Sequence, residues 1–432
     1  MPDVINNFSS LATDAPNVYI TRMMYTLSER NLAVGQFARV ETLPNYMSKT
    51  LRLIRYRRFN LPTATLIEGV PPESVGLVVD NVDVPVEQWG IVALLTDVLQ
   101  LTVNHPVLQI AMDRCALAIS ELVERETGKV LLTATNMVYP GTGNTSRADL
   151  AATDILDTAT VIGMTVQLRA RGAVPFEGGL YGGVLQPQHE GDLLKTDQTF
   201  QNSSNFARVK KLEYGEIGIW MGTQWVRGNF MPFFQGVAAP SGTAATATKA
   251  QITAATTGGT LATGNYLVVT VAREVISDYE RRVSQNSAPL AVTGPTGSVS
   301  VVTPTSPNYT YDIYLTQPGG TTLYKVRSRV AAATTVVLTS APTGAEAVAP
   351  VAPAAGVSTF PGWVFGKDAF TRVELNQMSM QSYVTPATAT WSNPLAQGRK
   401  TGTKFMFKVA KLDDNFMTMF ETGSSFPDYL PV

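Results

Sequence analysis

The chain has 432 residues, 44% of them hydrophobic, and a formal net charge of −1. A single core usually stops growing near about 250–300 residues, so this length predicts two or more units. The hydrophobic content excludes general disorder, and the near-neutral charge argues against strong, general affinity for nucleic acid. It also leaves little electrostatic repulsion between identical copies.

Cys115 is the single cysteine, which excludes an internal disulfide and fits synthesis in a reducing cytosol. The N-terminal segment lacks the basic and apolar regions of a signal peptide, and no apolar run near 18 residues predicts a spanning helix. Residues 1–40 hold only short apolar clusters, so we expect an arm that becomes ordered against something else.

Residues 41–103 are predicted to form a long β-hairpin. KTLRLIRYRRF provides a basic first strand, LIEGVPPES a Pro-rich tip, and GLVVDNVDVPVEQWGIVALLTD an acidic return. Three interpretations of the basic strand stay open: a solvated face, a strip that contacts phosphates, or a contact between subunits. The third is favoured because an exposed hairpin is only marginally stable alone and identical copies carry acidic partners. The candidate contact residues are Lys49, Arg52, Arg55, Arg57, Arg58, Asp80, Asp83 and Glu87.

Residues 104–128 give the clearest helical pattern. Asn104 suits the N-cap, Pro106 suits the first turn and Gly128 suits the end. The apolar stripe runs through Leu108, Met112, Cys115, Ile119 and Leu122.

A second helix is expected from about Arg147 to Leu168, with Ser146 as its cap and Asp149 three residues later. Its expected buried stripe is Ile155, Ala159, Ile162 and Val166. GLYGGVLQP then predicts a strand, QHEGDLLKTDQTFQNSSNFARV short helices, and KLEYGEIGIWMGTQWVRGNFMPFF strands joined by a Gly turn. Helices and strands mix without a strict alternation, which predicts an α+β fold.

The composition changes from Val237 to Gly356, where Met, Trp, Cys and His are missing and charges are sparse. Both flanks, APSGTAATATKAQ and APTGAEAVAPVAPAAG, are typical of linkers. Between them, strand patterns recur every 8–12 residues, as in a β-sandwich: NYLVVTVARE, RRVSQNSAP, GSVSVVTP, YTYDIYLTQ, LYKVRSRV and TTVVLTS. We expect an inserted all-β domain that splits the first unit into discontinuous parts.

Catalytic and metal sites are not indicated. One cysteine and two distant histidines, His105 and His189, cannot supply the ligands of a structural zinc site. The loop GTGNTS precedes an expected helix but lacks the spacing and lysine of a phosphate-binding loop. Cys115 on an apolar stripe predicts a buried, inert thiol. We therefore expect no cofactor and no enzymatic activity.

Five segments together resemble the major capsid proteins of tailed bacteriophages with the Hong Kong 97 (HK97-type) fold, in particular the N-four-like podophage capsid family. They are LPNYMSKTLRLIRYRRFNLPTATLIEGVPP, NHPVLQIAMDRCALAISELVERETG, RADLAATDIL with EGGLYGGVLQPQHEGDLL, VKKLEYGEIGIWMGTQWVRGNFMPFF, and TGTKFMFKVAKLDDNFMTMFE. Their order along the chain carries the resemblance, which covers most of residues 1–236 and 357–432.

The resemblance implies an N-terminal arm (1–40), an extended loop (41–103), a peripheral domain with a long spine helix (104–146) and an axial domain (147–236). Residues 357–432 would return to the axial and peripheral domains. The insertion (237–356) departs from the simplest pattern of the family. Its later strands are similar to immunoglobulin-like and fibronectin-type modules.

The resemblance implies a structural protein of the virion, made in the bacterial host cytoplasm, that self-assembles through hexamers and pentamers into an icosahedral shell. Such a shell would enclose double-stranded DNA without specific binding. Its expected partners are a portal protein and possibly scaffold or decoration proteins, and no membrane is expected. The insertion would face outward and could touch the host surface. The alternative is a carbohydrate- or cell-surface-binding module on an α+β scaffold.

Overall fold

The computed structural model describes residues 33–44, 48–61, 65, 74–96, 99, 106–196, 216–375, 380–385 and 398–426. The chain divides into two compact units. The first comprises Met1–Ser28, Ala38–Glu126 and Phe370–Leu412, and the second Glu29–Phe37, Thr127–Ala369 and Asp413–Val432. Most of the expected N-terminal arm lies outside the described residues, and the described chain begins just before the 3-10 turn η1 (Val34–Phe37).

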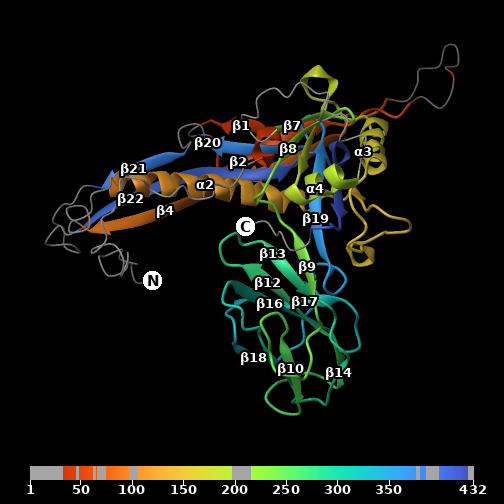
Figure 1. Cartoon of the computed structure of the whole chain (residues 1–432), viewed down its shortest axis with the longest axis vertical. Coiled ribbons are helices and arrows are strands. Elements are labelled where there is room, and N and C mark those ends of the chain that lie inside the picture. Colours follow the sequence, from red (N-terminus) through yellow and green to blue (C-terminus); the bar gives the residue numbers. More distant parts are fainter. Residues whose placement is uncertain are drawn as a thin grey trace. The chain divides into compact units, whose positions relative to one another are not determined.

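The first unit is built on a sheet around the long strand β22 (Gly398–Lys411). One side of β22 pairs with β4 (Glu87–Thr96), and the other with β20 (Phe370–Leu375) and β21 (Gln381–Thr385), while β1 (Arg39–Leu43) lies parallel to β20. Alternate residues of β22 are buried from Thr401 to Val409, as a sheet with one covered face requires. The strand is labelled in Figure 1.

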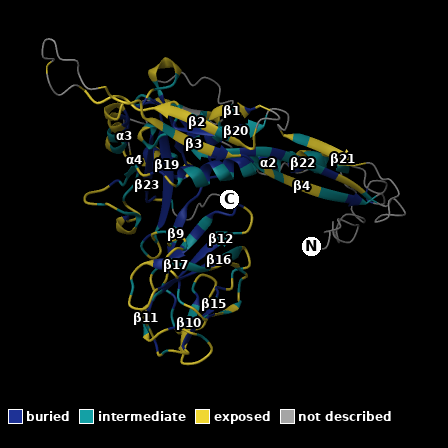
Figure 2. Ribbon diagram, turned by 180° about the vertical axis from the view of Figure 1, so that it is seen from behind, coloured by how far each residue is buried: buried dark blue, intermediate teal, exposed yellow. Residues whose placement is uncertain are grey.

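The expected hairpin is present in the first unit as β2 (Thr50–Tyr56) and β3 (Val79–Pro85). Its base is anchored by Val84 and Val86, which pack with Leu43 and Val373 in an apolar cluster. The rest is largely exposed, as the colouring of β2 and β3 in Figure 2 shows.

The helix expected at 104–128 is α2 (Val107–Leu131), which is about 37 Å long at about 1.5 Å per residue. Pro106 directly precedes it, Asn104 lies outside the described residues, and Cys115 and Ile119 are buried as expected. The expected end at Gly128 is wrong, because the helix runs three residues further. Gly128 is instead required by packing, since a Cβ there would lie 2.5 Å from the Tyr279 hydroxyl.

The second unit contains a mixed sheet, and the strands outside the insertion contribute buried residues to its apolar core. In chain order they are β5 (Met137–Val138), β6 (Tyr181–Leu185), β7 (Glu216–Trp220), β8 (Thr223–Arg227), β9 (Phe234–Val237), β19 (Ser358–Phe365) and β23 (Met417–Thr422). Helices α3 (Thr158–Ala170) and α4 (Pro187–Thr196) accompany them, with 3-10 turns η2 (Arg147–Asp149), η3 (Glu177–Gly179) and η4 (Asp414–Phe416). The Gly turn between β7 and β8 is confirmed: Met221 and Gly222 both have positive φ.

The second helix begins later than expected. The segment after Ser146 makes only the turn η2, and α3 starts at Thr158 with Asp157 as its N-cap, whose side chain accepts from the Thr160 backbone N–H at 2.9 Å. The expected buried stripe is also wrong. Val161, Met164 and Leu168 are buried, whereas Ile162 and Val166 are exposed. The helix has apolar residues on both sides, so the sequence pattern does not show which side is buried.

The insertion contains the six expected strand segments, one of which is divided into β11 and β12, and two further strands, β10 and β14. The nine strands are β10 (Gln251–Ala255), β11 (Gly264–Tyr266), β12 (Val268–Glu274), β13 (Glu280–Ser284), β14 (Leu290–Val292), β15 (Ser298–Val302), β16 (Tyr309–Thr316), β17 (Leu323–Val330) and β18 (Thr335–Leu338). One sheet has the order β10-β15-β18 and another runs β17-β16-β12-β13. Ile252, Val299 and Leu338 of the first share a core with Val268 and Ile313 of the second, which makes an all-β sandwich. Its immunoglobulin-like identity stays a prediction.

The sheet of the second unit continues without a break into the insertion. Strand β13 pairs in parallel with β9, which in turn pairs with β19, so one sheet runs from β17 to β7 among the described residues. The second flank is not a free linker, because Ala349 donates its backbone N–H to the Leu323 carbonyl at 3.0 Å and Lys325 donates to Ala347 at 2.8 Å.

Candidate assembly surface

The hairpin places its basic and acidic residues opposite each other. In the antiparallel register Arg52 lies across from Asp83, and Arg55 across from Asp80. The Arg52 guanidinium donates to both Asp83 oxygens, at 2.6 and 2.8 Å, and Arg57 approaches Asp80 to 2.7 Å. Hydrogen bonds from these arginines hold the pKa of Asp80 and of Asp83 below the usual range. Because the arginines and Asp83 are exposed and Asp80 is partly exposed, each pair contributes little to stability.

The eight candidate contact residues therefore divide into two groups. Asp80, Asp83 and the arginines that face them have partners within the same hairpin, and Glu87 accepts from Lys408 at 2.7 Å. Among the described residues, the side chains of Lys49 and Arg58 are exposed and make no ion pair. These two are the cations of the hairpin that remain available to another molecule.

The far end of the hairpin carries exposed apolar side chains that the sequence argument overlooked. Phe59 is 57% exposed and Leu61 is 86% exposed. We call the group the apolar tip; its members are Ile54, Tyr56, Phe59, Leu61, Val75, Leu77, Val78 and Val79. An exposed apolar patch rimmed by polar residues is typical of a protein–protein contact. The signal was visible in the sequence as FNL and VGLVV on either side of the Pro-rich stretch.

Strand β4 offers a second feature of this kind in the first unit. Among the described strands it pairs only with β22, so no described strand covers its other edge. The edge reads EQWGIVALLT, without a charge after Glu87, and Val92 is 67% exposed. Proteins usually protect such edges with charge, proline or a cover, so an open apolar edge indicates a segment that another strand can join.

The loop GTGNTS, His189 and Cys115, which were considered as possible chemical sites, have structural roles. In GTGNTS, the backbone N–H groups of Thr145 and Ser146 donate to Asp149 at 3.1 and 2.9 Å, so those donors are not directed at a phosphate. His189 is fully buried and burial lowers its pKa to about 4. Burial also raises the pKa of the Cys115 thiol, which makes it a poor nucleophile. His105 lies outside the described residues.

None of the described helices is long and apolar enough to cross a membrane. No group of three or more His, Cys, Asp or Glu side chains is arranged in the described part of the chain to hold a metal ion.

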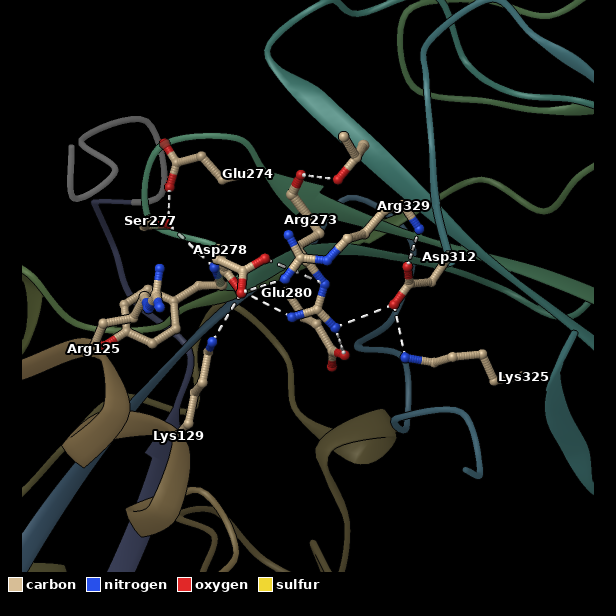
Figure 3. Close-up of polar contacts among 12 residues, drawn as sticks. Arg125, Lys129, Arg273, Glu274, Ser277, Asp278, Glu280, Asp312, Lys325 and Arg329 are labelled. Atoms are coloured by element: carbon tan, nitrogen blue, oxygen red, sulfur yellow. Dashed lines mark hydrogen bonds and ion pairs between the residues drawn. The ribbon is translucent and has the colours of Figure 1, made fainter. Parts of the chain in front are cut away.

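A cluster of charged residues fixes the insertion to the end of helix α2 within the second unit. Asp278, in the turn between β12 and β13, receives Lys129 and Arg329 at 2.9 Å each, and Arg273 donates to its backbone carbonyl at 2.9 Å (Figure 3). Burial alone would raise the pKa of Asp278, but these cations hold it below the usual range. The cluster continues to Asp312, which binds Lys325 at 2.8 Å.

A fully buried arginine supports the same junction. Arg281 donates to Glu274 at 3.0 Å and to the Met231 carbonyl at 2.8 Å, and its guanidinium lies over the Phe233 ring. Removing a partner of this buried charge would be strongly destabilising. The insertion is therefore held by side chains as well as by the continuous sheet.

The fold is that of phage capsid proteins. The structure is similar to the capsid of Ralstonia phage GP4 (TM-score 0.51, 10% identity, 96% of this chain and 98% of that one). It is also similar to the head of Helicobacter pylori bacteriophage KHP40 (0.51, 10%, 96% and 99%) and to the capsid of cyanophage P-SCSP1u (0.50, 12%, 95% and 94%).

The expected fold is therefore confirmed: the chain has the α+β Hong Kong 97-type fold of tailed-phage major capsid proteins, over nearly its whole length. No protein-family model and no curated protein matches the sequence. The N-four-like branch stays a prediction.

Proposed function

We propose that this chain is a major capsid protein that self-assembles into the icosahedral head of a tailed phage. The proposal rests on one observation: a fold found in phage capsid proteins, matched along almost all of both chains. The apolar tip and the open edge of β4 support it, because both are surfaces that an isolated soluble protein would normally cover.

The proposed mechanism is geometric. Identical copies close into hexamers and pentamers, and the hairpin of one copy lies over its neighbour, so that stability belongs to the lattice more than to the subunit. Double-stranded DNA is held by enclosure, which needs no specific binding face and agrees with the near-neutral charge. The portal, scaffold and decoration proteins remain proposed partners, and synthesis in the host cytoplasm is part of the same proposal.

The insertion is proposed to face outward as an immunoglobulin-like module that braces neighbours or contacts the host surface. Its attachment through Asp278 and the continuous sheet supports a fixed orientation. The alternative function, a carbohydrate- or cell-surface-binding module, makes a different prediction for the purified protein: a clean monomer that binds glycans and forms no rings, sheets or shells in negative-stain microscopy.

The hairpin provides the mutational test. Replacing the apolar tip in the double variant Phe59→Ser/Leu61→Ser should reduce particle yield at least tenfold while the subunit keeps its circular dichroism and melting temperature. The reason is that both side chains are more than half exposed in the free chain, so their loss costs little there. Ile276→Ser, which removes an equally exposed aliphatic from the insertion, is the matched control.

Particle formation is counted by sedimentation and negative-stain microscopy. Normal particles from the double variant would contradict the hairpin contact, and the absence of particles from the unsubstituted chain at high concentration would contradict the capsid proposal itself. Arg58→Glu tests the free cation in the same assay, whereas reversing Arg57 also breaks its pair with Asp80 and is less informative.

A further inference from the structure

Helix α3 in the second unit has an apolar face that the described part of the chain leaves uncovered. Val161, Met164 and Leu168 fill the core on the inner side. On the other side, Ile162 is 44% exposed and Val166 is 56% exposed. We call this side the outer stripe; its members are Ala159, Ile162, Gly163, Val166 and Ala170. Apolar residues on two sides of a helix indicate that both sides are covered, and the described residues cover only the inner one.

For Gly163, in the middle of the outer stripe, the described residues provide no packing reason. A Cβ at this position would meet nothing within 4 Å, and its backbone is not in the left-handed region. Glycine inside a helix costs about 1 kcal/mol relative to alanine. By contrast, Gly128 and Gly183 have a side chain of the same chain packed against them. A glycine that a neighbour must approach closely accounts for the cost, as in helix pairs with small residues at their contact.

We propose that the outer stripe packs against a second copy of this chain, with Gly163 letting the neighbour approach the helix backbone. The inference rests on the proposed shell function and identifies one of its contacts. The five members of the stripe are uncharged, whereas the exposed Arg169, seven residues after Ile162, lies at the edge of the stripe. The contact must therefore leave this arginine in water or beside an acidic group of the neighbour.

The size of the stripe decides between a second copy and an independent partner. The helix of 13 residues is about 20 Å long, and one face of it buries far less than the roughly 800 Å² per partner of a stable free-standing complex. The contact can persist only together with others made by the same partner. Identical copies that also engage the hairpin satisfy this condition, because linked weak contacts reinforce each other.

Two substitutions test the contact without disturbing the subunit. Gly163→Leu places a side chain where the free chain has open space, and leucine favours the helix, so the melting temperature of the dissociated subunit should stay equal or rise. Val166→Lys introduces a charge at a position already exposed. Both should lower particle yield at least tenfold. The matched control is Val337→Lys, which places the same charge at a valine that is 45% exposed on strand β18.

Particle yield by sedimentation and subunit melting by circular dichroism are measured side by side. A more stable subunit that no longer assembles in Gly163→Leu, with normal assembly in the control, supports the contact. Full assembly of both stripe variants overturns it and leaves the capsid proposal intact. Failure of the unsubstituted chain to assemble overturns the capsid proposal instead. Equal loss in the control overturns the specific role of the stripe.

Discussion

At the scale of single residues, Gly128 illustrates how a missing side chain determines packing. The Tyr279 hydroxyl occupies the space that a Cβ would need, next to the turn that carries Asp278. The sequence pattern suggested a helix end because glycine is common there. The structure shows a close approach inside the helix, which a single sequence cannot distinguish from a C-cap.

Gly128→Ala should therefore destabilise the subunit by about 1–3 kcal/mol, because the clash outweighs the gain of about 1 kcal/mol in helix propensity. In the background of Tyr279→Phe, which removes the hydroxyl, the same substitution should be neutral or stabilising. Urea unfolding of the four proteins in this cycle measures the coupling. Equal effects of Gly128→Ala in both backgrounds would refute the close-approach explanation.

His189 predicts a pH dependence. Its Nδ1 accepts from the Gln186 backbone N–H at 3.2 Å and its Nε2 donates to the Phe360 carbonyl at 3.1 Å, between the rings of Phe360 and Phe420. Burial lowers the folded pKa to about 4 from 6.5. Between these values the unfolded chain binds a proton that the folded chain excludes, so stability falls as the pH drops from 6.5 towards 4.

The loss should reach about 3 kcal/mol near pH 4. His189→Gln keeps one acceptor and one donor but cannot titrate, so the difference between pH 7 and pH 4.5 in the free energy of unfolding should be smaller in the variant. Glu190 and Asp192 on the same helix are present in both proteins, so the comparison isolates the histidine. Identical pH profiles would show that His189 does not contribute.

At the scale of elements, the cluster at Asp278 determines how firmly the insertion is held. Asp278 has φ = 58°, a conformation that asparagine also tolerates. Asp278→Asn therefore removes the charge without straining the turn. It leaves Lys129, Arg273 and Arg329 less well compensated, and we expect a loss of about 2 kcal/mol. Because the pKa of Asp278 is lowered, its contribution is present at neutral pH and is lost as the pH falls through the lowered pKa.

Hydrogen exchange provides the local measurement for this variant. Amide protection should fall in the turn between β12 and β13 and in the last turn of α2, and stay unchanged in the strands β10, β15 and β18 on the far sheet. Asp113→Asn, at an exposed position of α2, serves as the control. Uniform loss of protection throughout the second unit would contradict a local anchor.

The elements differ in how well the sequence predicted them. The six strand segments expected in the insertion are present because alternating apolar residues and turns define strands locally. Helix α3 was misplaced because Ser146 is as good a cap by type as Asp157, and because both of its faces are apolar. The ion pairs across the hairpin depend on which residues of β2 and β3 lie opposite each other. The charge pattern alone did not specify this register, so the pairs could not be predicted from the sequence.

At the scale of the whole molecule, the fold was predictable and the assembly surface only partly so. The order of segments indicated the capsid fold, which the solved capsid structures confirm. The candidate contacts were chosen by charge, whereas the exposed groups that another copy could bury are mainly apolar: Leu61, Val92, Ile162 and Val166. Sequence patterns treat apolar residues as core, so they cannot distinguish a core within one chain from a surface completed by several copies.

The chain leaves β9 and returns in β19 at adjacent points, since Gln235 lies opposite Ser358 in an antiparallel register. Residues paired in this way are about 5 Å apart. The 237–356 segment thus begins and ends at neighbouring points of the sheet. A foreign polypeptide inserted there would need similarly close termini, and it would have to cover the edge of β9 and Leu132 and replace the contacts of Asp278 and Arg281. A single replacement in the gene would then place the same foreign polypeptide on every subunit of the proposed particle.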